Sequence, residues 1–293
     1  MTGVTSWSPL AVTHVIPGDK GVNAVTSLDD RVYVVRRDKK EVEIYDAATL
    51  TLERRLPVPG ISHCASGIAA CSRNKCLYLS DWNNPIIHRV DLATDVTKKW
   101  RVAKGPLGLS VNRDYNLLVA CRDDSKLQEY TTDGRLVREI CLGATDLWWL
   151  AEYRPWHAIQ LSSGDYLVSN PASPLKMFSH VISVVGADGR LRRSYSPPIF
   201  SIVGLVKYPG NLANTEYGDI LVVDQSCNRI LAINSSLTRV QRLPIPADVE
   251  LQGPRALYLD ETRDRLYIGE IGGKCRVIVL NNLSSVRLTR EPE

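Results

Sequence analysis

"DILVVDQSCNRILAINSSLTRV", residues 219–240, contains two short runs of aliphatic and β-branched residues, at 220–223 and 230–233. Polar residues separate the two runs, and the turn-forming residues "NSS" follow the second. Short apolar runs bounded by turn-forming residues are typical of β-strands. The stretch therefore predicts two antiparallel strands joined by one turn and followed by another.

The same arrangement recurs along the whole chain. The first run of each unit is "RVYVVR" at 31, "CLYLSD" at 76, "NLLVACR" at 116, "DYLVSN" at 165, "DILVVD" at 219 and "RLYIGE" at 265. If Tyr33, Tyr78, Leu118, Leu167, Leu221 and Tyr267 are equivalent, the spacings are 45, 40, 49, 54 and 46 residues. A period of 40 to 50 residues with several strands per unit indicates a β-propeller.

Two further runs complete each unit. A polar run such as "TLERRLPVPG" at 51 suits the solvated outer edge of a blade. A run before each first strand suits the inner edge, where backbones crowd around the axis and small residues fit best. The small residues form one column: Ala24, Gly67, Gly108, Ala158, Gly204 and Ala256.

We therefore predict an all-β fold, a six-bladed β-propeller with four-stranded antiparallel blades in a single domain over residues 1–293. An irregular β-sandwich with accidental spacing is the alternative. The blades are expected at roughly 21–60, 61–105, 106–143, 155–198, 201–247 and 252–293. A terminal strand should close the ring, because closure leaves no sheet edge unpaired. We favour residues 8–17 for this strand, with "SSVRLTRE" at 284 as the alternative.

Composition excludes a disordered chain, since 44% of the residues are hydrophobic and 23% are charged. The net charge of +4 is mild and permits nucleic acid binding without indicating it. Seven cysteines and no recognisable signal peptide favour a reducing compartment, the cytoplasm. Two glycosylation sequons, at Asn234 and Asn282, favour secretion as the alternative. No membrane insertion is expected, because no apolar run approaches the roughly 18 residues that it requires.

Two stretches resemble a known family. "DQSCNRILAIN" at 224 resembles the Asp-x-x-x-Asn-Arg-Ile core of NHL repeats, and "SDWNNPIIHRVDLAT" at 80 resembles blades of the related NHL, YWTD and gluconolactonase-like propellers. The resemblance implies that Asp224 and Asn228 cap a turn and that Arg229 lies across it. Tripartite-motif NHL proteins further imply binding of RNA or protein on one face.

Strand direction alternates within a blade, so one face of the disc should carry the blade-to-blade connectors and the turns between second and third strands. We call it the loop face, and the other the opposite face. The connector "ATDLWWLAEYRPWHA", residues 144–158, lies on the loop face and is rich in aromatic residues, of which Trp156 is expected to be packed. Tryptophan, tyrosine and arginine often anchor interfaces. The predicted binding residues are Trp148, Trp149, Tyr153, Arg154, His157, Arg122, Lys176, Phe178, Arg255 and Arg36.

These residues predict a non-enzymatic module that binds a protein or peptide on the loop face of blades 3 and 4. RNA is a second candidate ligand, although Asp81, Asp123, Asp124, Asp224 and Glu270 are expected on the same face as the basic residues. No cofactor is expected.

A metal-dependent hydrolase or lactonase is the alternative. Gluconolactonase-like propellers hold a divalent cation such as calcium at the channel mouth through Glu, Asn and Asp side chains. The resemblance would make Asn170 and Asp224 ligands, together with His157 or Glu270, but no glutamate occupies the inner column. The cysteines are interpreted as small buried residues and not as zinc ligands.

Overall fold

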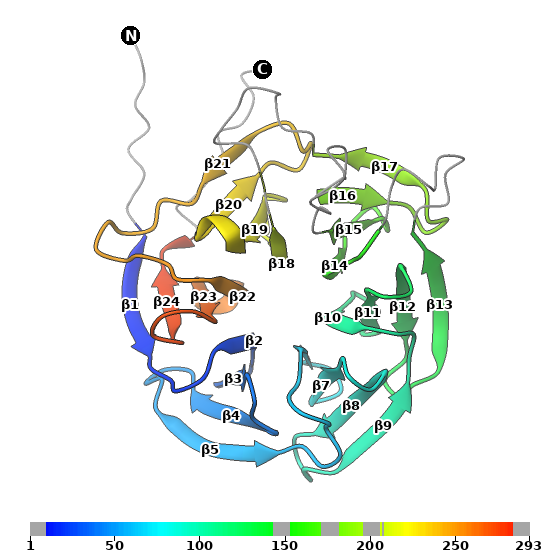
Figure 1. Ribbon diagram of the computed structural model, residues 1–293, viewed down its shortest axis with the longest axis horizontal. Coiled ribbons are helices and arrows are strands. Elements are labelled where there is room, and N and C mark those ends of the chain that lie inside the picture. The colour runs from blue at the N-terminus through cyan, green and yellow to red at the C-terminus, as the bar shows by residue number, and fades with distance from the viewer. Residues whose placement is uncertain (1–9, 143–152, 171–181, 196–205, 207, 284–293) are drawn as a thin grey trace.

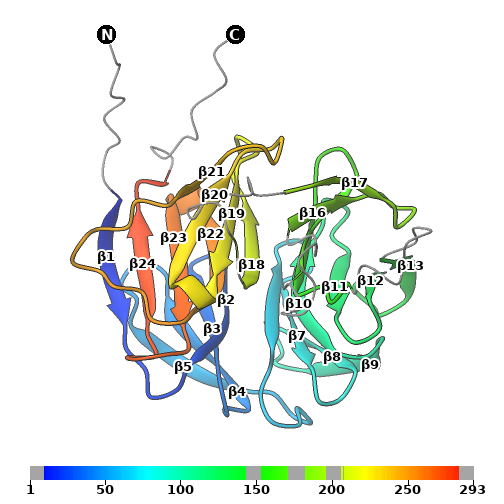
Figure 2. The ribbon, with the colours of Figure 1, turned by 45° about the horizontal axis from the view of Figure 1, so that its top comes forward.

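The computed structural model describes residues 10–142, 153–170, 182–195, 206 and 208–283. It contains six four-stranded antiparallel sheets, arranged as blades around a central axis (Figure 1). The strands of each blade run between the two faces of the disc (Figure 2). The predicted all-β six-bladed propeller is therefore confirmed.

In the first half of the ring, each blade consists of four consecutive strands, ordered from the axis outward. Blade 1 has β2 (Val22–Leu28), β3 (Arg31–Arg36), β4 (Glu41–Asp46) and β5 (Leu52–Pro57). Blade 2 has β6 (Gly67–Cys71), β7 (Cys76–Asp81), β8 (Ile86–Asp91) and β9 (Thr97–Arg101). Blade 3 has β10 (Pro106–Val111), β11 (Leu117–Cys121), β12 (Lys126–Tyr130) and β13 (Leu136–Cys141).

The second half of the ring follows the same plan, except that the outermost strand of blade 6 is β1. Blade 4 has β14 (His157–Gln160), β15 (Tyr166–Ser169), β16 (Ile182–Val185) and β17 (Leu191–Ser194). Blade 5 has β18 (Pro209–Asn214), β19 (Ile220–Asp224), β20 (Arg229–Ile233) and β21 (Val240–Arg242). Blade 6 has β22 (Pro254–Asp260), β23 (Arg265–Glu270), β24 (Val277–Asn281) and β1 (Ala11–Ile16). Two single turns of 3₁₀ helix, η1 (Gln225–Cys227) and η2 (Glu261–Arg263), follow β19 and β22.

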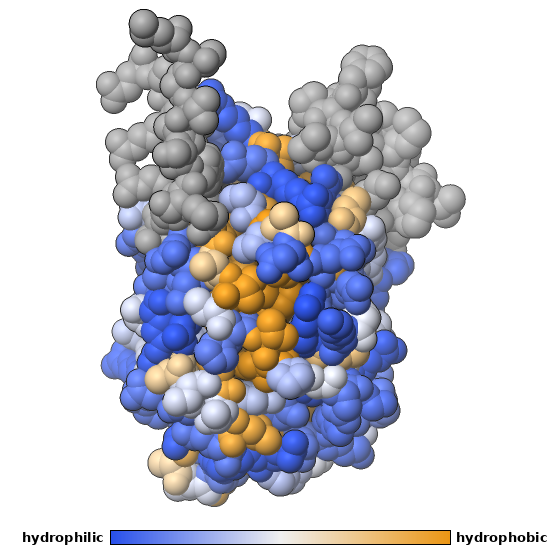
Figure 3. All heavy atoms as spheres, turned by 90° about the vertical axis from the view of Figure 1, so that its left-hand side faces the viewer, coloured by the Kyte–Doolittle hydropathy of each residue, from blue (hydrophilic) through white to orange (hydrophobic). Residues whose placement is uncertain are grey.

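The N-terminal strand closes the ring. β1 pairs antiparallel with β24, so the outermost strand of blade 6 comes from the other end of the chain. Figure 3 views the ring from the side that carries β1, where hydrophobic residues form a band within a largely hydrophilic surface. Val15 of β1 is 43% exposed. Closure by a terminal strand is as predicted, and residues of the favoured segment form that strand.

The seam between blades 6 and 1 is also held by buried polar contacts. Arg36, only 1% exposed, donates to the Glu43 carboxylate at 2.6 Å. Its other nitrogens donate to backbone carbonyls of Pro17, Lys20 and Cys275 at 2.8 to 3.0 Å. Arg36 thus ties blade 1 to the segment after β1 and to the β23–β24 hairpin.

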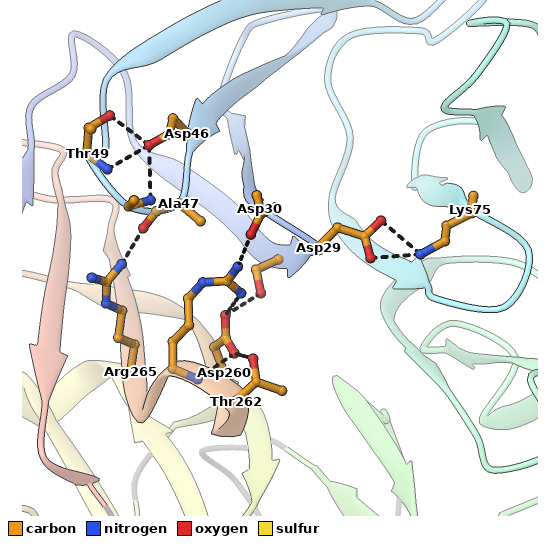
Figure 4. A network of polar contacts seen from close by, with 12 residues as sticks. Asp29, Asp30, Asp46, Ala47, Thr49, Lys75, Asp260, Thr262 and Arg265 are labelled. Atoms are coloured by element: carbon orange, nitrogen blue, oxygen red, sulfur yellow. Dashed lines mark hydrogen bonds and ion pairs between the residues drawn. The ribbon is translucent and has the colours of Figure 1, made fainter.

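Polar contacts cross the seam on the opposite face as well (Figure 4). Arg263 binds Asp30 at 2.7 Å, and Arg265 donates to the carbonyl of Ala47. The next blade is joined to blade 1 there by Lys75, whose amine lies 2.7 Å from Asp29. The first-to-second and third-to-fourth turns therefore link neighbouring blades.

Hydrophobic packing lies between blades. Six clusters of buried residues each join two neighbouring blades around the ring. Tyrosines at the equivalent positions Tyr33, Tyr78 and Tyr267 are at most 2% exposed. With only two phenylalanines in the chain, tyrosine supplies much of the large aromatic volume of the core.

The inner strands crowd the axis as the small-residue column predicts. A Cβ atom at Gly67 would lie 2.2 Å from the carbonyl oxygen of Leu107, and one at Gly108 would lie 2.5 Å from that of Trp156. Backbone of the next blade occupies the space that a side chain would need.

The predicted column is wrong in blade 5. Its inner strand, β18, pairs Leu212 with Val222, so Asn211 takes the place assigned to Gly204. Asn211 precedes Leu221 by ten residues, and the small residues of the other blades precede their anchors by nine to eleven. Gly204 precedes Leu221 by seventeen, so the length of the intervening hairpin excludes it.

Candidate recognition site on the loop face

Arg255 lies at the loop-face mouth of the central channel. It is the second residue of β22 and is half-buried. Its guanidinium carbon lies 4.8 Å from the ring centroid of Trp156, which precedes the inner strand of blade 4. Trp156 packs edge-on against Tyr208 before blade 5, with ring centroids 5.7 Å apart. The side chain of Arg255 therefore reaches from blade 6 past blade 5 to the aromatic pair.

The Arg255 guanidinium has no carboxylate partner or hydrogen bond within the part of the chain that the structure describes. Burial lowers the pKa of Arg255, and the nearby charge of Arg37 lowers it further. Arg37 itself is exposed on the turn after β3. The mouth thus holds two arginines whose positive charges oppose each other.

Acidic residues near this mouth are already paired. Asp38 binds His63 at 2.7 Å and lies 3.7 Å from the amine of Lys20. Asp19 accepts a hydrogen bond from Lys39 at 3.0 Å. Asp38 directly follows Arg37 in the sequence, yet among the described residues no carboxylate pairs with either arginine of the mouth.

A second arginine and tryptophan pair lies on the loop face between blades 2 and 3. Arg122, after β11, has its guanidinium carbon 5.6 Å from the ring centroid of Trp82, which follows β7. Trp82 is 40% exposed and donates its indole N–H to Asp123 at 3.2 Å. The Arg122 Nε is buried with no hydrogen-bond partner among the described residues. Trp82 thus presents a large aromatic surface with its polar atom satisfied.

The connector before blade 4 divides into exposed and buried residues. Arg154 is exposed, and its backbone N–H binds the Asn170 side chain at 2.6 Å. Trp156 is 7% exposed, which fits the expected packing role. Tyr153, also a predicted binding residue, is only 5% exposed and packs between blades 3 and 4. Its carbonyl oxygen accepts a hydrogen bond from Ser125. Four predicted binding residues lie outside the described residues: Trp148, Trp149, Lys176 and Phe178.

Two other predicted binding residues have structural roles instead. Arg36 is buried at the seam with each guanidinium nitrogen engaged. His157 is 6% exposed and bridges three inner strands. Its Nδ1 accepts from the backbone N–H of Leu212 at 3.3 Å, and its Nε2 lies 3.1 Å from the carbonyl oxygen of Leu109. Both bonds are made by the neutral form protonated at Nε2, and burial lowers the pKa of His157 to about 4.

The candidate metal ligands also hold the fold together. Side chains at the ends of second strands accept backbone N–H groups of the incoming connectors: Asp81 from Ser62 at 2.8 Å, Asn170 from Arg154 at 2.6 Å, Asp224 from Tyr208 at 3.1 Å and Glu270 from Gln252 at 2.7 Å. Asp224 and Glu270 also bind Arg229 and Arg276 of their own blades, at 2.9 and 2.8 Å. These side chains therefore clamp the connectors, while a metal-binding role for them stays a prediction.

Histidine and cysteine side chains do not gather into a metal site among the described residues. Over the described ranges, no group of three or more His, Cys, Asp and Glu side chains is placed to hold a metal ion. All seven cysteines are free thiols, of which Cys71, Cys76 and Cys121 are buried. The turn after β19 follows the predicted motif in part: Arg229 binds Asp224 and Asn228 adopts a left-handed conformation at φ 49°, but the Asp224 side chain does not cap η1.

Below the mouth, inner strands line a cavity of about 270 Å³. Its walls combine aliphatic side chains with Thr26, Ser110, His157 and Asn211. A wider hollow of about 740 Å³ opens on the opposite face, and the two share Ala70, Val111, Tyr258 and Leu259. The described part of the chain contains no helix long and apolar enough to span a membrane.

Trp82 and Tyr208 are the contributors that the sequence alone did not single out. Trp82 follows the second strand of its blade directly, as Arg122 does in the next, and this shared register was the available signal. Tyr208 gave no signal, because the inner strand of blade 5 was misplaced by several residues.

Comparisons with known proteins identify the fold. No family model matches the chain, and neither does any curated protein. Virginiamycin B lyase from Staphylococcus aureus superposes with a TM-score of 0.65 at 11% identity, covering 92% of this chain and 98% of the lyase. A streptogramin B lyase gives 0.62 at 14%, covering 94% and 98%. Hydrazine synthase of Kuenenia stuttgartiensis gives 0.63 at 17%, covering 92% and 79%. At these identities the likeness establishes the six-bladed propeller, while the NHL subfamily stays a prediction.

Proposed function

We propose that the protein is a non-enzymatic recognition module that binds a protein or peptide on its loop face. The observation that carries the proposal is the pair of arginine and tryptophan contacts on this face, Arg122 with Trp82 and Arg255 with Trp156. Arginine stacked on an aromatic ring keeps its N–H groups available for a ligand. Such residues contribute most of the binding energy in many interfaces.

Enzymatic chemistry is less well supported by the described residues. One lyase structure is a catalytically inactive variant with a histidine replaced by alanine, bound to quinupristin. In this chain His157 is the histidine that lines the described channel cavity, and both of its ring nitrogens are occupied by backbone groups. A general base or metal ligand needs a free nitrogen, so His157 is suited to neither role.

The test is selection of peptides from a random displayed library against the immobilised full chain, followed by affinity measurement in solution. Replacing Trp82 and Arg122 together by alanine should weaken binding of the selected peptides more than tenfold. The opposite face offers a matched control, because Arg73 stacks on Tyr115 there at 5.3 Å. The Arg73→Ala/Tyr115→Ala variant should change affinity less than twofold.

Failure to select any peptide, or equal losses in the two double variants, would count against the proposal. A random RNA pool provides the competing outcome. Binding of RNA that weakens steeply with salt, together with no selected peptide, would replace the peptide by RNA as the ligand.

A further inference from the structure

We infer that the loop-face mouth of the channel is a carboxylate-binding site, in which Arg255 and Arg37 receive an acidic side chain or chain terminus of the bound peptide. The inference rests on the proposed function and specifies the chemistry of the ligand. The carboxylate would approach along the axis of the ring.

The geometry of Arg255 suits a carboxylate ligand. Its guanidinium faces the Trp156 ring at 4.8 Å, and Trp156 is fixed by burial and by Tyr208. Stacking uses the face of a guanidinium and leaves its edge, where the N–H groups lie. A carboxylate binds such an edge through two parallel hydrogen bonds. Arg255 is therefore held in an orientation suited to this ligand.

The charge of Arg255 is not compensated by any described acidic residue. Arg255 is half-buried, and its guanidinium has no acidic partner within the described ranges. Buried charges in proteins are normally paired, because desolvation of an unpaired ion is costly. Arg36 shows what this chain does when an arginine serves the fold: Glu43 and three carbonyl groups surround it. Among the described residues Arg255 has no such set, which is the arrangement expected of an arginine that binds a ligand.

Arg37 supplies the second positive charge. Its backbone N–H binds the carbonyl of Gly21 at 2.7 Å, which holds the exposed Arg37 beside the start of inner strand β2, and it makes no described side-chain ion pair, since Asp38 is taken by His63 and Lys20. Two like charges that repel each other in the free protein would both be stabilised by one anion between them.

A single carboxylate fits the surroundings better than a polyphosphate chain. The side chain of Asp19, in the connector between β1 and β2, is 66% exposed, and Asp123, after β11, is exposed as well. A chain of phosphates crossing the face would meet these acids, whereas one carboxylate at the axis would not. The observations therefore favour a peptide over RNA as the source of the anion.

The direct test is titration of the full chain with N-acetylglycine, a mimic of a peptide terminus. The indole N–H signal of Trp156, assigned with a Trp156→Phe variant, is followed by NMR. We expect a saturable shift in the millimolar range. N-acetylglycinamide, which is neutral and nearly the same size, should give no saturable shift. Arg255→Met should abolish saturation, Arg37→Met should raise the half-saturating concentration at least threefold, and the control Arg73→Met should leave it unchanged.

Other outcomes separate the alternatives. Equal shifts with the acid and the amide, or saturation that survives Arg255→Met, would overturn the site. Saturation by inorganic phosphate at a tenfold lower concentration than N-acetylglycine would overturn the assignment to carboxylate. If selected peptides depend on Trp82 and Arg122 but not on Arg255 or on an acidic residue, the inference fails and the proposed function stands. If N-acetylglycine saturates the site but no peptide is selected, the site stands and the proposed function fails.

Discussion

Two arginines are removed from bulk water, Arg36 at the seam between blades 6 and 1 and Arg255 at the mouth of the channel. Polar partners surround Arg36, whereas Arg255 contacts an aromatic ring. Burial acts to lower the pKa of both. At the seam the Glu43 hydrogen bond and charge more than offset burial, and the pKa of Arg36 is raised. At the mouth an aromatic ring is the contact of Arg255, and its pKa stays lowered. An arginine with every guanidinium nitrogen engaged serves the fold, whereas one whose nitrogens are unengaged is available to a ligand.

The largest expected effect tests this difference directly. Arg36→Met should lower the free energy of unfolding by about 3 to 5 kcal/mol, because it leaves the Glu43 carboxylate buried without its cation. Arg255→Met should change it by less than about 1 kcal/mol, the value of one cation–π contact. Urea unfolding followed by circular dichroism measures both.

If Arg36→Met does not fold, Glu43→Gln provides the second measurement. The amide keeps a hydrogen-bond acceptor but removes the charge, so the loss should be smaller than with methionine. Equal losses for Arg36→Met and Arg255→Met would show that the two arginines are alike and would contradict the comparison.

Sequence patterns alone could not predict the difference between Arg36 and Arg255. The repeat spacing was enough to predict six blades, and strand alternation was enough to place Arg122 and Arg255 on the loop face. Neither pattern could show that Arg36 is surrounded by partners while Arg255 is not. One partner of Arg36, Cys275, is 239 positions away, and the Trp156 ring that Arg255 contacts belongs to another blade. The contact of Arg36 with Glu43 was easier to predict, since Glu43 pairs with Val34 across the β3–β4 hairpin. The register of that hairpin would have flagged a local ion pair.

The misplaced inner strand of blade 5 has a different cause. Small residues are frequent in connectors as well as at the axis, so the presence of Gly204 in a plausible run was not sufficient evidence. The separation of nine to eleven residues between small residue and anchor carries more information, since it is fixed by the length of one tight hairpin. The same error removed Tyr208 from the predicted site.

His157, below the mouth, has both ring nitrogens hydrogen-bonded to backbone groups and should make stability depend on pH. The folded pKa of His157 is about 4, below the ordinary value of 6.5. Above pH 6.5 its contribution to stability is complete. As pH falls towards 4, the unfolded state takes up the proton first, and about 3 kcal/mol of stability is lost.

The stability difference between wild type and His157→Gln should therefore shrink by about 3 kcal/mol between pH 7 and pH 4. Urea midpoints at several pH values measure it. His14→Gln on the exposed face of β1 is the control. A difference that does not change with pH would mean that His157 is not held neutral by its two backbone bonds.

His88 can be compared with His157, because it is also buried but has no hydrogen bond at either ring nitrogen among the described residues. It is fully buried on β8, and neither ring nitrogen has a hydrogen-bond partner among the described residues. Burial lowers its pKa and Lys99 lowers it further, while Asp81 raises it. His88→Leu loses no hydrogen bond, so stability at pH 7 should change by less than about 1.5 kcal/mol. At pH 5 the variant should be more stable than wild type, and the reverse order would show that the imidazole is needed by the fold.

The smallest effect is expected at an exposed tie between blades. Lys75 and Asp29 link blades 2 and 1 on the opposite face at 2.7 Å, but both side chains are more than half exposed. Water already solvates such charges, so Lys75→Met should cost less than about 1 kcal/mol, and salt should reduce even this. Arg36 and Lys75 both join neighbouring blades, Arg36 through buried backbone carbonyls and Lys75 through an exposed carboxylate. If their losses in urea unfolding were similar, burial would not be what makes the seam strong, and the reasoning that reserves Arg255 for a ligand would lose its basis.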